Sequence, residues 1–196
     1  MQSHQRVVVL VRHGETEWTR TAQHAGRADI PLTARGQADA ERLRDRLAPV
    51  DFARVLVSPL SRARQTCALA GYGQRAEERA ELLEWDYGAY QGLTAQQVLA
   101  ARPDWALWRD GCPAGDTAAA VGARVDRLLD EVTRVQGNVL LFAHGHLLRV
   151  VAARWVGLPP EAGAHLALST ASVSVLGLEH AHRVVWTWND VSHLQG

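Results

Sequence analysis

Two short apolar runs, each ended by a histidine and a glycine, constrain the fold of this chain more than any other feature. Residues 7–11 and 139–143 are continuous apolar segments in which valine and leucine predominate. Segments of this length and composition are typical of strands that are covered on both faces of a parallel sheet. The first run leads through Arg12 into His13-Gly14, and the second leads into His144-Gly145. Because ligands bind beyond the carboxyl ends of such strands, both histidines are expected at one ligand-binding edge.

Helical and extended patterns alternate along the chain, which predicts an α/β fold with a mainly parallel sheet. Ser58-Pro59 is expected to cap a helix that runs to about residue 70. Residues 84–115 break the alternation with tryptophan, glycine and proline, and are expected to form a small helical cap inserted into a single domain of residues 1–196. Further helices are expected over residues 33–48, 94–101 and 103–110, from a cap at Asp116 or Thr117 to about residue 135, and from the end of the polar turn 144–146 to residue 156. The other strands are expected over residues 55–57, 74–81, 171–178 and 183–188.

The basic residues are of one kind, because all 21 of them are arginine and lysine is absent. This excludes a Schiff base, a lysine general base and the phosphate-binding lysine of a P-loop. A composition rich in alanine, arginine, glycine and leucine accounts for the bias. Any anion must then be bound by guanidinium groups, imidazoles and backbone N–H groups.

Charge and cysteine usage narrow the class of protein further. The arginines are balanced by 21 acidic residues, and the pI is about 7.1, which argues against a nucleic-acid partner. Cys67 and Cys112 lack metal-binding spacing, so reduced thiols are expected, Cys67 buried in a helix and Cys112 a candidate for exposure. The sequence contains neither a signal-peptide pattern nor a run of roughly 18 apolar residues. A cytoplasmic protein without a membrane partner is therefore expected.

The two histidines, facing each other after neighbouring strands, suggest phosphoryl transfer. One neutral imidazole can act as the nucleophile, while the other, protonated, offsets the charge of a phosphate dianion. Arg12 and Arg62 can bind phosphate oxygens through two N–H groups each. A carboxylic acid must protonate the departing alcohol. The residues alone leave that acid open among four candidates, which are Glu15, Glu17, Glu84 and Asp86.

Several motifs in a fixed order then identify a family. The chain resembles the histidine phosphatase superfamily, the phosphoglycerate-mutase-like enzymes, over residues 6 to about 190. The resemblance implies a three-layer α/β/α fold with a small helical cap. The segments that carry it are Arg12-His13-Gly14-Glu15-Thr16-Glu17-Trp18, residues 29–33 with Gly36, residues 58–66, residues 83–88 with Gln91-Gly92, and residues 143–146.

The resemblance also implies a role for each matching position. His13 is the nucleophile that forms a phosphohistidine, and Glu84 is the proton donor to the leaving oxygen. His144 stabilises the phosphoryl group in the transition state. The residues expected to bind phosphate are Arg12, Arg62, Gly14, Thr19 and Gly145, the glycines because they allow the backbone to approach a ligand closely.

Some positions depart from the family pattern. Ala25 precedes Gly26 where many relatives carry a serine or threonine hydroxyl that contacts phosphate, which predicts a looser phosphate site. Thr19 stands where mutases often have asparagine, and it can still donate a hydrogen bond. Gln91 and Asp116 stand where glutamate is commoner. None of these changes alters the nucleophile, so activity is expected.

Other residues near the motifs have two interpretations each. His146 either reaches the mouth of the site or supports the helix behind it. Trp85, Trp105 and Trp108 either stack on a substrate or, as we favour, pack the cap helices. Arg64 and Arg149 are expected to form ion pairs. A metal site built from the four histidines His13, His24, His144 and His146 is disfavoured, because two arginines adjoin it and no acidic pair accompanies it.

Three functions remain open, of which a phosphomonoester hydrolase is favoured. A mutase must exclude water from its phosphohistidine, and mutases of this family carry a larger insertion after the glutamate motif. Only 60 positions separate Glu84 from His144 here. The third function, a non-catalytic phospholigand-binding module, conflicts with an intact nucleophile. The expected substrate is a small phosphorylated metabolite, a sugar phosphate or one of a broad set. No cofactor is expected for a hydrolase, whereas the mutase alternative requires 2,3-bisphosphoglycerate. A homodimer is compatible with the sequence, which reveals no interface.

Overall fold

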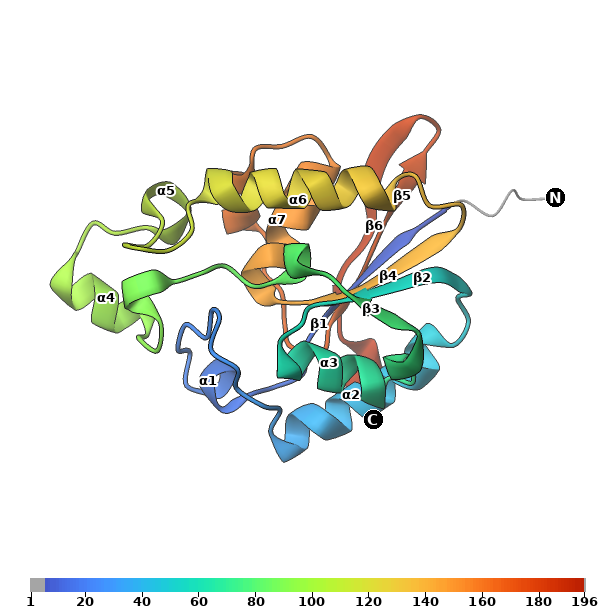
Figure 1. Cartoon of the computed structure of the whole chain (residues 1–196), viewed down its shortest axis with the longest axis horizontal. Coiled ribbons are helices and arrows are strands. Elements are labelled where there is room, and N and C mark those ends of the chain that lie inside the picture. Colours follow the sequence, from blue (N-terminus) through green and yellow to red (C-terminus); the bar gives the residue numbers. More distant parts are fainter. Residues whose placement is uncertain (1–5, 196) are drawn as a thin grey trace.

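A six-stranded sheet forms the centre of the protein (Figure 1). The computed structural model describes residues 6–195. Strand order across the sheet is β3-β2-β4-β1-β5-β6; the pairings among β3, β2, β4 and β1 are parallel, and those of β5 with β1 and with β6 are antiparallel. The strands are β1 (Val8–Arg12), β2 (Phe52–Val57), β3 (Ala76–Glu78), β4 (Asn138–Ala143), β5 (Val173–Glu179) and β6 (His182–Asp190).

Helices cover both faces of this sheet, which confirms the predicted three-layer α/β/α fold. Apolar side chains of α2 (Ala34–Leu47) and α3 (Ser61–Leu69) pack on one face, and those of α6 (Ala118–Val132) and α7 (Gly145–Trp155) pack on the other. Thr33 accepts a hydrogen bond from the Gly36 N–H and so caps α2 as expected. Short 3-10 helices connect the larger elements: η1 (Gly73–Arg75), η2 (Ala80–Leu82), η3 (Gly88–Tyr90), η4 (Pro160–His165) and η5 (Ser192–Leu194).

The insertion of β4 between β1 and β2 determines where the site forms. Arg12 is paired with Ala143 in the parallel register, so the next residues, His13 and His144, leave the sheet side by side. The His13 N–H donates to the Ala143 carbonyl at 2.9 Å, which extends the ladder by one bond. From β1 the chain continues to β2 and β3 on one side of the sheet, and from β4 it continues to β5 and β6 on the other side. Such a switch point opens a crevice at the carboxyl ends of the strands.

The segment of residues 84–115 extends beyond the sheet at the left of Figure 1. It contains α4 (Ala95–Ala101) and α5 (Leu107–Asp110), close to the two short helices expected there. Trp85 and Trp105 are buried within it, and their indole N–H groups donate to the backbone carbonyls of Asp116 and Gly111. Cys112 is buried too, at 8 % exposure, so its expected exposure is wrong.

Two local expectations also differ from the structure. Ser58-Pro59 does not cap α3, because the N-cap is Leu60 and makes no side-chain hydrogen bond there. A short helix, α1 (Glu17–Arg20), was not expected, and a capping box between Thr16 and Thr19 begins it.

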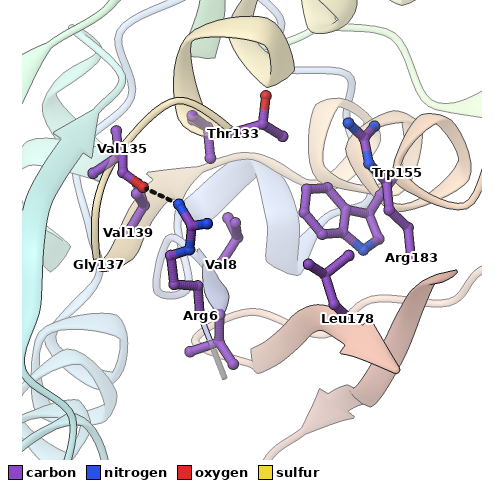
Figure 2. A pocket seen from close by; sticks show the side chains of 11 residues that line it. Arg6, Val8, Thr133, Val135, Gly137, Val139, Trp155, Leu178 and Arg183 are labelled. Carbon is purple, nitrogen blue, oxygen red and sulfur yellow. Dashed lines mark hydrogen bonds between the residues drawn. The ribbon is translucent and has the colours of Figure 1, made fainter. Parts of the chain in front are cut away.

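A cavity lies at the edge of the sheet where β1 and β4 begin, opposite to the crevice at their carboxyl ends. It has a volume of about 210 Å³ and is lined mainly by apolar side chains. Figure 2 shows Arg6 bonded to the Val135 carbonyl on one side and Arg183 beside Trp155 on the other. No helix between residues 6 and 195 is long and apolar enough to cross a membrane.

Candidate active site

A cavity of about 210 Å³ opens at the carboxyl ends of β1 and β4 and collects most of the predicted site residues. The side chains that line it come from the turn after β1, from α1, from α3, from the segment around Glu84 and from the start of α7. Its lining residues are Arg12, His13, Trp18, Thr19, Ala22, Gln23, His24, Ala25, Gly26, Arg62, Glu84, Tyr87, Gly145, His146, Arg149 and Leu168.

His13 is held in one tautomer by its own turn. Its side chain is 3 % exposed, and its Nδ1 lies 2.7 Å from the Gly14 carbonyl oxygen. A carbonyl oxygen only accepts hydrogen bonds, so Nδ1 carries the proton and donates it. Nε2 therefore keeps its lone pair. Burial, together with the charges of Arg62 and Arg12, holds the imidazole pKa well below its usual value, so the ring is neutral near pH 7.

Gly14 supports this arrangement through its backbone. Its N–H donates to the Thr66 hydroxyl at 3.0 Å, and that hydroxyl donates to the Arg62 carbonyl at 2.7 Å. A Cβ at Gly14 would collide with the carbonyl oxygen of Gly36. Glycine is needed here because two backbones meet, and the phosphate-binding role expected of Gly14 stays a prediction.

His144 lies beside His13, as the strand ends predict. The two ring centroids are 5.2 Å apart, with an angle of 61° between the planes. Nε2 of His144 lies 2.7 Å from the Ser58 hydroxyl, which is the contact that Ser58 makes in place of a helix cap. Burial and the charge of Arg62 lower the His144 pKa well below its usual value. This low pKa favours the neutral imidazole near pH 7, so the protonated form expected beside a phosphate dianion needs the negative charge of that dianion.

Arg62, which is buried, and Arg12, which is partly buried, line the cavity without a carboxylate partner in the described part of the chain. Arg62 is fully buried and donates to the Ala28 and Gly26 carbonyls at 2.8 and 2.9 Å, and Arg12 donates to the Leu168 carbonyl. Neither guanidinium forms an ion pair within residues 6–195. The Nε atom of each is buried with no hydrogen-bond partner in that range. Burial lowers both pKa values, and an anion between the two groups would restore the lost solvation.

Glu84 reaches the same cavity and is bound to the first turn of α7. Its carboxylate accepts from the backbone N–H groups of Trp85 at 3.0 Å, Leu147 at 2.9 Å and His146 at 3.2 Å. Burial alone would raise the Glu84 pKa, but the nearby imidazole of His146 and these three donors outweigh it and hold the pKa below its usual value. The helix dipole acts in the same direction, because the carboxylate lies at the N-terminus of α7.

The remaining residues predicted to bind phosphate are less free than expected. Thr19 lines the cavity, but its hydroxyl already accepts from the Thr16 N–H at 2.8 Å and donates to the Thr16 carbonyl at 2.9 Å. Gly145 lines the cavity as well, and a Cβ there would lie 3.3 Å from the Arg12 guanidinium carbon. Glycine at this position makes room for Arg12. Ala25 and Gly26 lie at the wall, and Ala25 has no hydroxyl to offer.

The three cap tryptophans do not line the cavity. Trp85 packs edge-on against Trp108 at a centroid distance of 5.4 Å, and Trp105 packs against Tyr90 at 5.3 Å. Their placement agrees with the interpretation that they pack the cap. His146 does line the cavity, which agrees with the interpretation that it reaches the mouth of the site.

Sequence reasoning missed several residues of this region. Arg149 was expected in an ion pair, but it lies over Trp108 at 4.8 Å and donates to the carbonyls of Gly163 and Ala164. Arg64 does form the expected ion pair, with Glu78 at 3.4 Å. Tyr87 could have been found from its place in the motif of residues 83–88. Ser58 and Thr66 also belong to a motif, whereas no sequence signal singles out His24.

The described part of the chain contains no cluster suited to a metal ion. Within residues 6–195, no three His, Cys, Asp or Glu side chains gather as potential ligands. The histidine pair is instead flanked by Arg12 and Arg62, whose positive charges oppose a divalent cation.

Comparisons with known proteins agree with this arrangement. Residues 8–191 match the sequence profile of the histidine phosphatase superfamily, branch 1. The chain is 39 % identical to an acid phosphatase of Mycobacterium tuberculosis over 180 residues, 90 % of this chain and 88 % of the relative. It is 32 % identical to the sedoheptulose 1,7-bisphosphatase of Saccharomyces cerevisiae over 182 residues, 76 % of this chain and 67 % of the relative. A solved structure from Mycobacterium tuberculosis superposes with a TM-score of 0.90 at 37 % identity, covering 94 % of this chain and 97 % of the other.

Fold and relatives together define an α/β phosphatase. The chain belongs to the histidine phosphatase superfamily, branch 1. The family predicted from the ordered motifs is therefore confirmed, and so is the prediction of a phosphatase within it.

Proposed function

We propose that this phosphatase hydrolyses phosphomonoesters through a phosphohistidine on Nε2 of His13, without a metal ion. One observation carries the proposal: two guanidinium groups with buried Nε atoms, and without counter-ions within residues 6–195, lie at the cavity that His13 enters with its Nε2 lone pair free. A phosphate dianion supplies the negative counter-charge for Arg12 and Arg62, and its binding there places phosphorus next to the nucleophile.

In the first step, the Nε2 lone pair of His13 attacks phosphorus and forms the N–P bond. The P–O bond to the alcohol breaks, and its electron pair goes to the leaving oxygen, which takes a proton from Glu84. The ring keeps its Nδ1 proton and becomes cationic, and the Gly14 carbonyl that accepts from Nδ1 stabilises that charge. Protonation of Glu84 before this step is favoured by the incoming dianion, which raises the pKa of a nearby carboxyl group.

In the second step, water attacks the phosphohistidine. Glu84, now a carboxylate, accepts a proton from that water, the N–P bond breaks, and its electron pair returns to Nε2 of His13. Phosphate leaves, and both residues are restored. His144 is neutral before substrate binds, and the dianion favours its protonation, so it can add a positive charge in the transition state.

The substrate class follows from the relatives and from the cavity. The yeast relative is named a sedoheptulose 1,7-bisphosphatase and the mycobacterial one an acid phosphatase. A cavity of about 210 Å³ accommodates a small phosphorylated metabolite better than a phosphoprotein segment. We assign a sugar phosphate as the substrate class, and water rather than a second hydroxyl as the acceptor of the phosphoryl group.

A panel of phosphomonoesters tests the proposal. Phosphate release without 2,3-bisphosphoglycerate is expected, whereas strict dependence on that compound with an isomerised product would select the mutase. Acid quench should trap an acid-labile phosphoenzyme in the wild type and none in His13→Ala, which should be inactive. Excess chelator should leave the rate unchanged. Full activity of His13→Ala, or loss of activity with chelator, would overturn the mechanism.

A further inference from the structure

A hydrogen-bonded pair, Tyr87 and His146, lies beside the general acid and is not used by the steps above. The Tyr87 hydroxyl lies 2.6 Å from Nδ1 of His146. Tyr87 is 3 % exposed, and the imidazole of His24 stacks on its ring at a centroid distance of 4.4 Å and an angle of 18°. Both members of the pair line the cavity.

The direction of this hydrogen bond can be worked out. Within residues 6–195 the Tyr87 hydroxyl has no other hydrogen-bond partner. Burial raises the Tyr87 pKa well above its usual value and lowers the His146 pKa to about 4, so both groups are neutral near pH 7. A buried phenol must place its proton on an acceptor. The Tyr87 O–H therefore donates to Nδ1, and the imidazole proton lies on Nε2.

The His146 ring is enclosed on its other sides. The centroids of Trp108 and Trp85 lie 5.5 and 6.4 Å from it, and its backbone N–H donates to Glu84. Nε2 of His146 makes no hydrogen bond within the described residues. The residue is partly buried and lines the cavity. The structure thus leaves one oriented N–H donor next to the group that protonates the leaving oxygen.

We infer that Tyr87 and His146 determine substrate specificity: the Tyr87 hydroxyl holds the imidazole in the Nε2–H tautomer, and this N–H donates to an acceptor oxygen on the leaving group. The inference rests on the proposed function, because the leaving group is defined by it. His146 touches the substrate, and Tyr87 is a positioning residue that acts through His146. The substrates selected are esters of hydroxyl-rich alcohols, which carry acceptor oxygens beyond the ester oxygen, over esters of apolar alcohols or phenols.

Two substrates and one conservative variant test this. Tyr87→Phe keeps the ring that packs on His24 and removes only the hydroxyl. For ribose 5-phosphate, kcat/KM should fall about three- to tenfold, mainly through KM, which is the range expected for one hydrogen bond. For phenyl phosphate, whose leaving group has no further oxygen, it should change less than twofold. Tyr90→Phe is the matched control, because Tyr90 lies in the same segment and contacts Trp105 rather than the cavity, and it should change neither substrate.

Coupling and tautomer provide independent readouts. His146→Ala should show the same substrate-dependent loss, and adding Tyr87→Phe to it should cause no further loss, because the hydroxyl acts only through the imidazole. His146→Gln serves as the milder variant if the alanine protein does not fold. The nitrogen chemical shifts of His146 should report a single Nε2–H tautomer in the wild type and a loss of that single state in Tyr87→Phe.

The outcomes are distinguishable from failure of the proposed function. If the wild type releases phosphate from neither substrate, the proposed function itself fails. If the wild type hydrolyses both substrates, an equal loss on both in Tyr87→Phe, additive losses in the double variant, or no loss on ribose 5-phosphate would each overturn the specificity role.

Discussion

Replacing Arg62 by methionine should separate catalysis from stability. Arg62 is fully buried, and within residues 6–195 it has no carboxylate partner. The substitution removes two charge-assisted hydrogen bonds, to Ala28 and Gly26, worth about 1.5–3 kcal/mol each. It also removes the cost of burying an unpaired charge, which is several kcal/mol. The two effects nearly cancel, so the free energy of unfolding should change by no more than about 2 kcal/mol.

Activity should respond very differently. Loss of one donor group aimed at transition-state charge reduces kcat by about 10²–10³, and a guanidinium offers more than one N–H. We expect kcat/KM to fall about 10³-fold, which corresponds to about 4 kcal/mol of transition-state stabilisation. Arg64→Met is the matched control, because Arg64 lies two residues further along α3 in an exposed ion pair with Glu78, and such pairs contribute about 0–1 kcal/mol.

Urea unfolding and steady-state kinetics on both variants provide the measurement. Two results together would refute this reasoning. The free energy of unfolding of Arg62→Met would fall by more than about 4 kcal/mol, a size that marks a structural defect, and its kcat/KM would stay within tenfold of the wild type. Arg62 would then be a structural cation rather than a phosphate ligand.

Three further predictions concern the acid, the nucleophile's support and pH. Glu84→Gln should slow kcat by about 10²–10³ for alkyl phosphates but by less than tenfold for p-nitrophenyl phosphate, whose leaving group needs no proton; equal losses would remove the acid role. Thr66→Val should lower kcat about tenfold and stability by about 1–3 kcal/mol, because the Gly14 N–H loses its partner, and Thr66→Ser should restore both. His146 binds its proton more weakly when folded, with a pKa of about 4 against 6.5, so its contribution to stability is complete above about pH 6.5 and falls as the pH drops toward 4, by about 3 kcal/mol. Urea titrations from pH 7 to 4 should show this fall, and His146→Gln should flatten it.

The pairing of His13 with His144 could be predicted from the sequence for a clear physical reason. Each histidine follows a strand that its apolar pattern identifies, and parallel strands end at a common edge of the sheet. The prediction took the two strands to be neighbours, and the parallel pairing of β1 with β4 confirms this. The cap of α2 at Thr33 could also be predicted, since a cap is a local property of a few residues.

The position of Glu84 could not be derived in that way. Its segment has no helical or strand periodicity, and its carboxylate is oriented by N–H groups of α7, some sixty residues further along the chain. Ser58 shows the converse: its local pattern predicted a cap, but a tertiary contact with His144 took the hydroxyl instead. Cys112 was misjudged because burial in an irregular segment depends on what packs over it, which no pattern near residue 112 reveals.

The attachment of the Glu84 carboxylate to the first turn of α7 has a thermodynamic consequence. In the resting protein those backbone donors favour the ionised form. Under the proposed mechanism the protonated form is required once the dianion is present, so substrate binding and proton uptake are linked. Linkage is reciprocal: if the ligand promotes protonation of Glu84, a lower pH must tighten ligand binding by the same factor. Binding of inorganic phosphate should therefore draw protons from the buffer, and its calorimetric heat should vary with the ionisation enthalpy of that buffer.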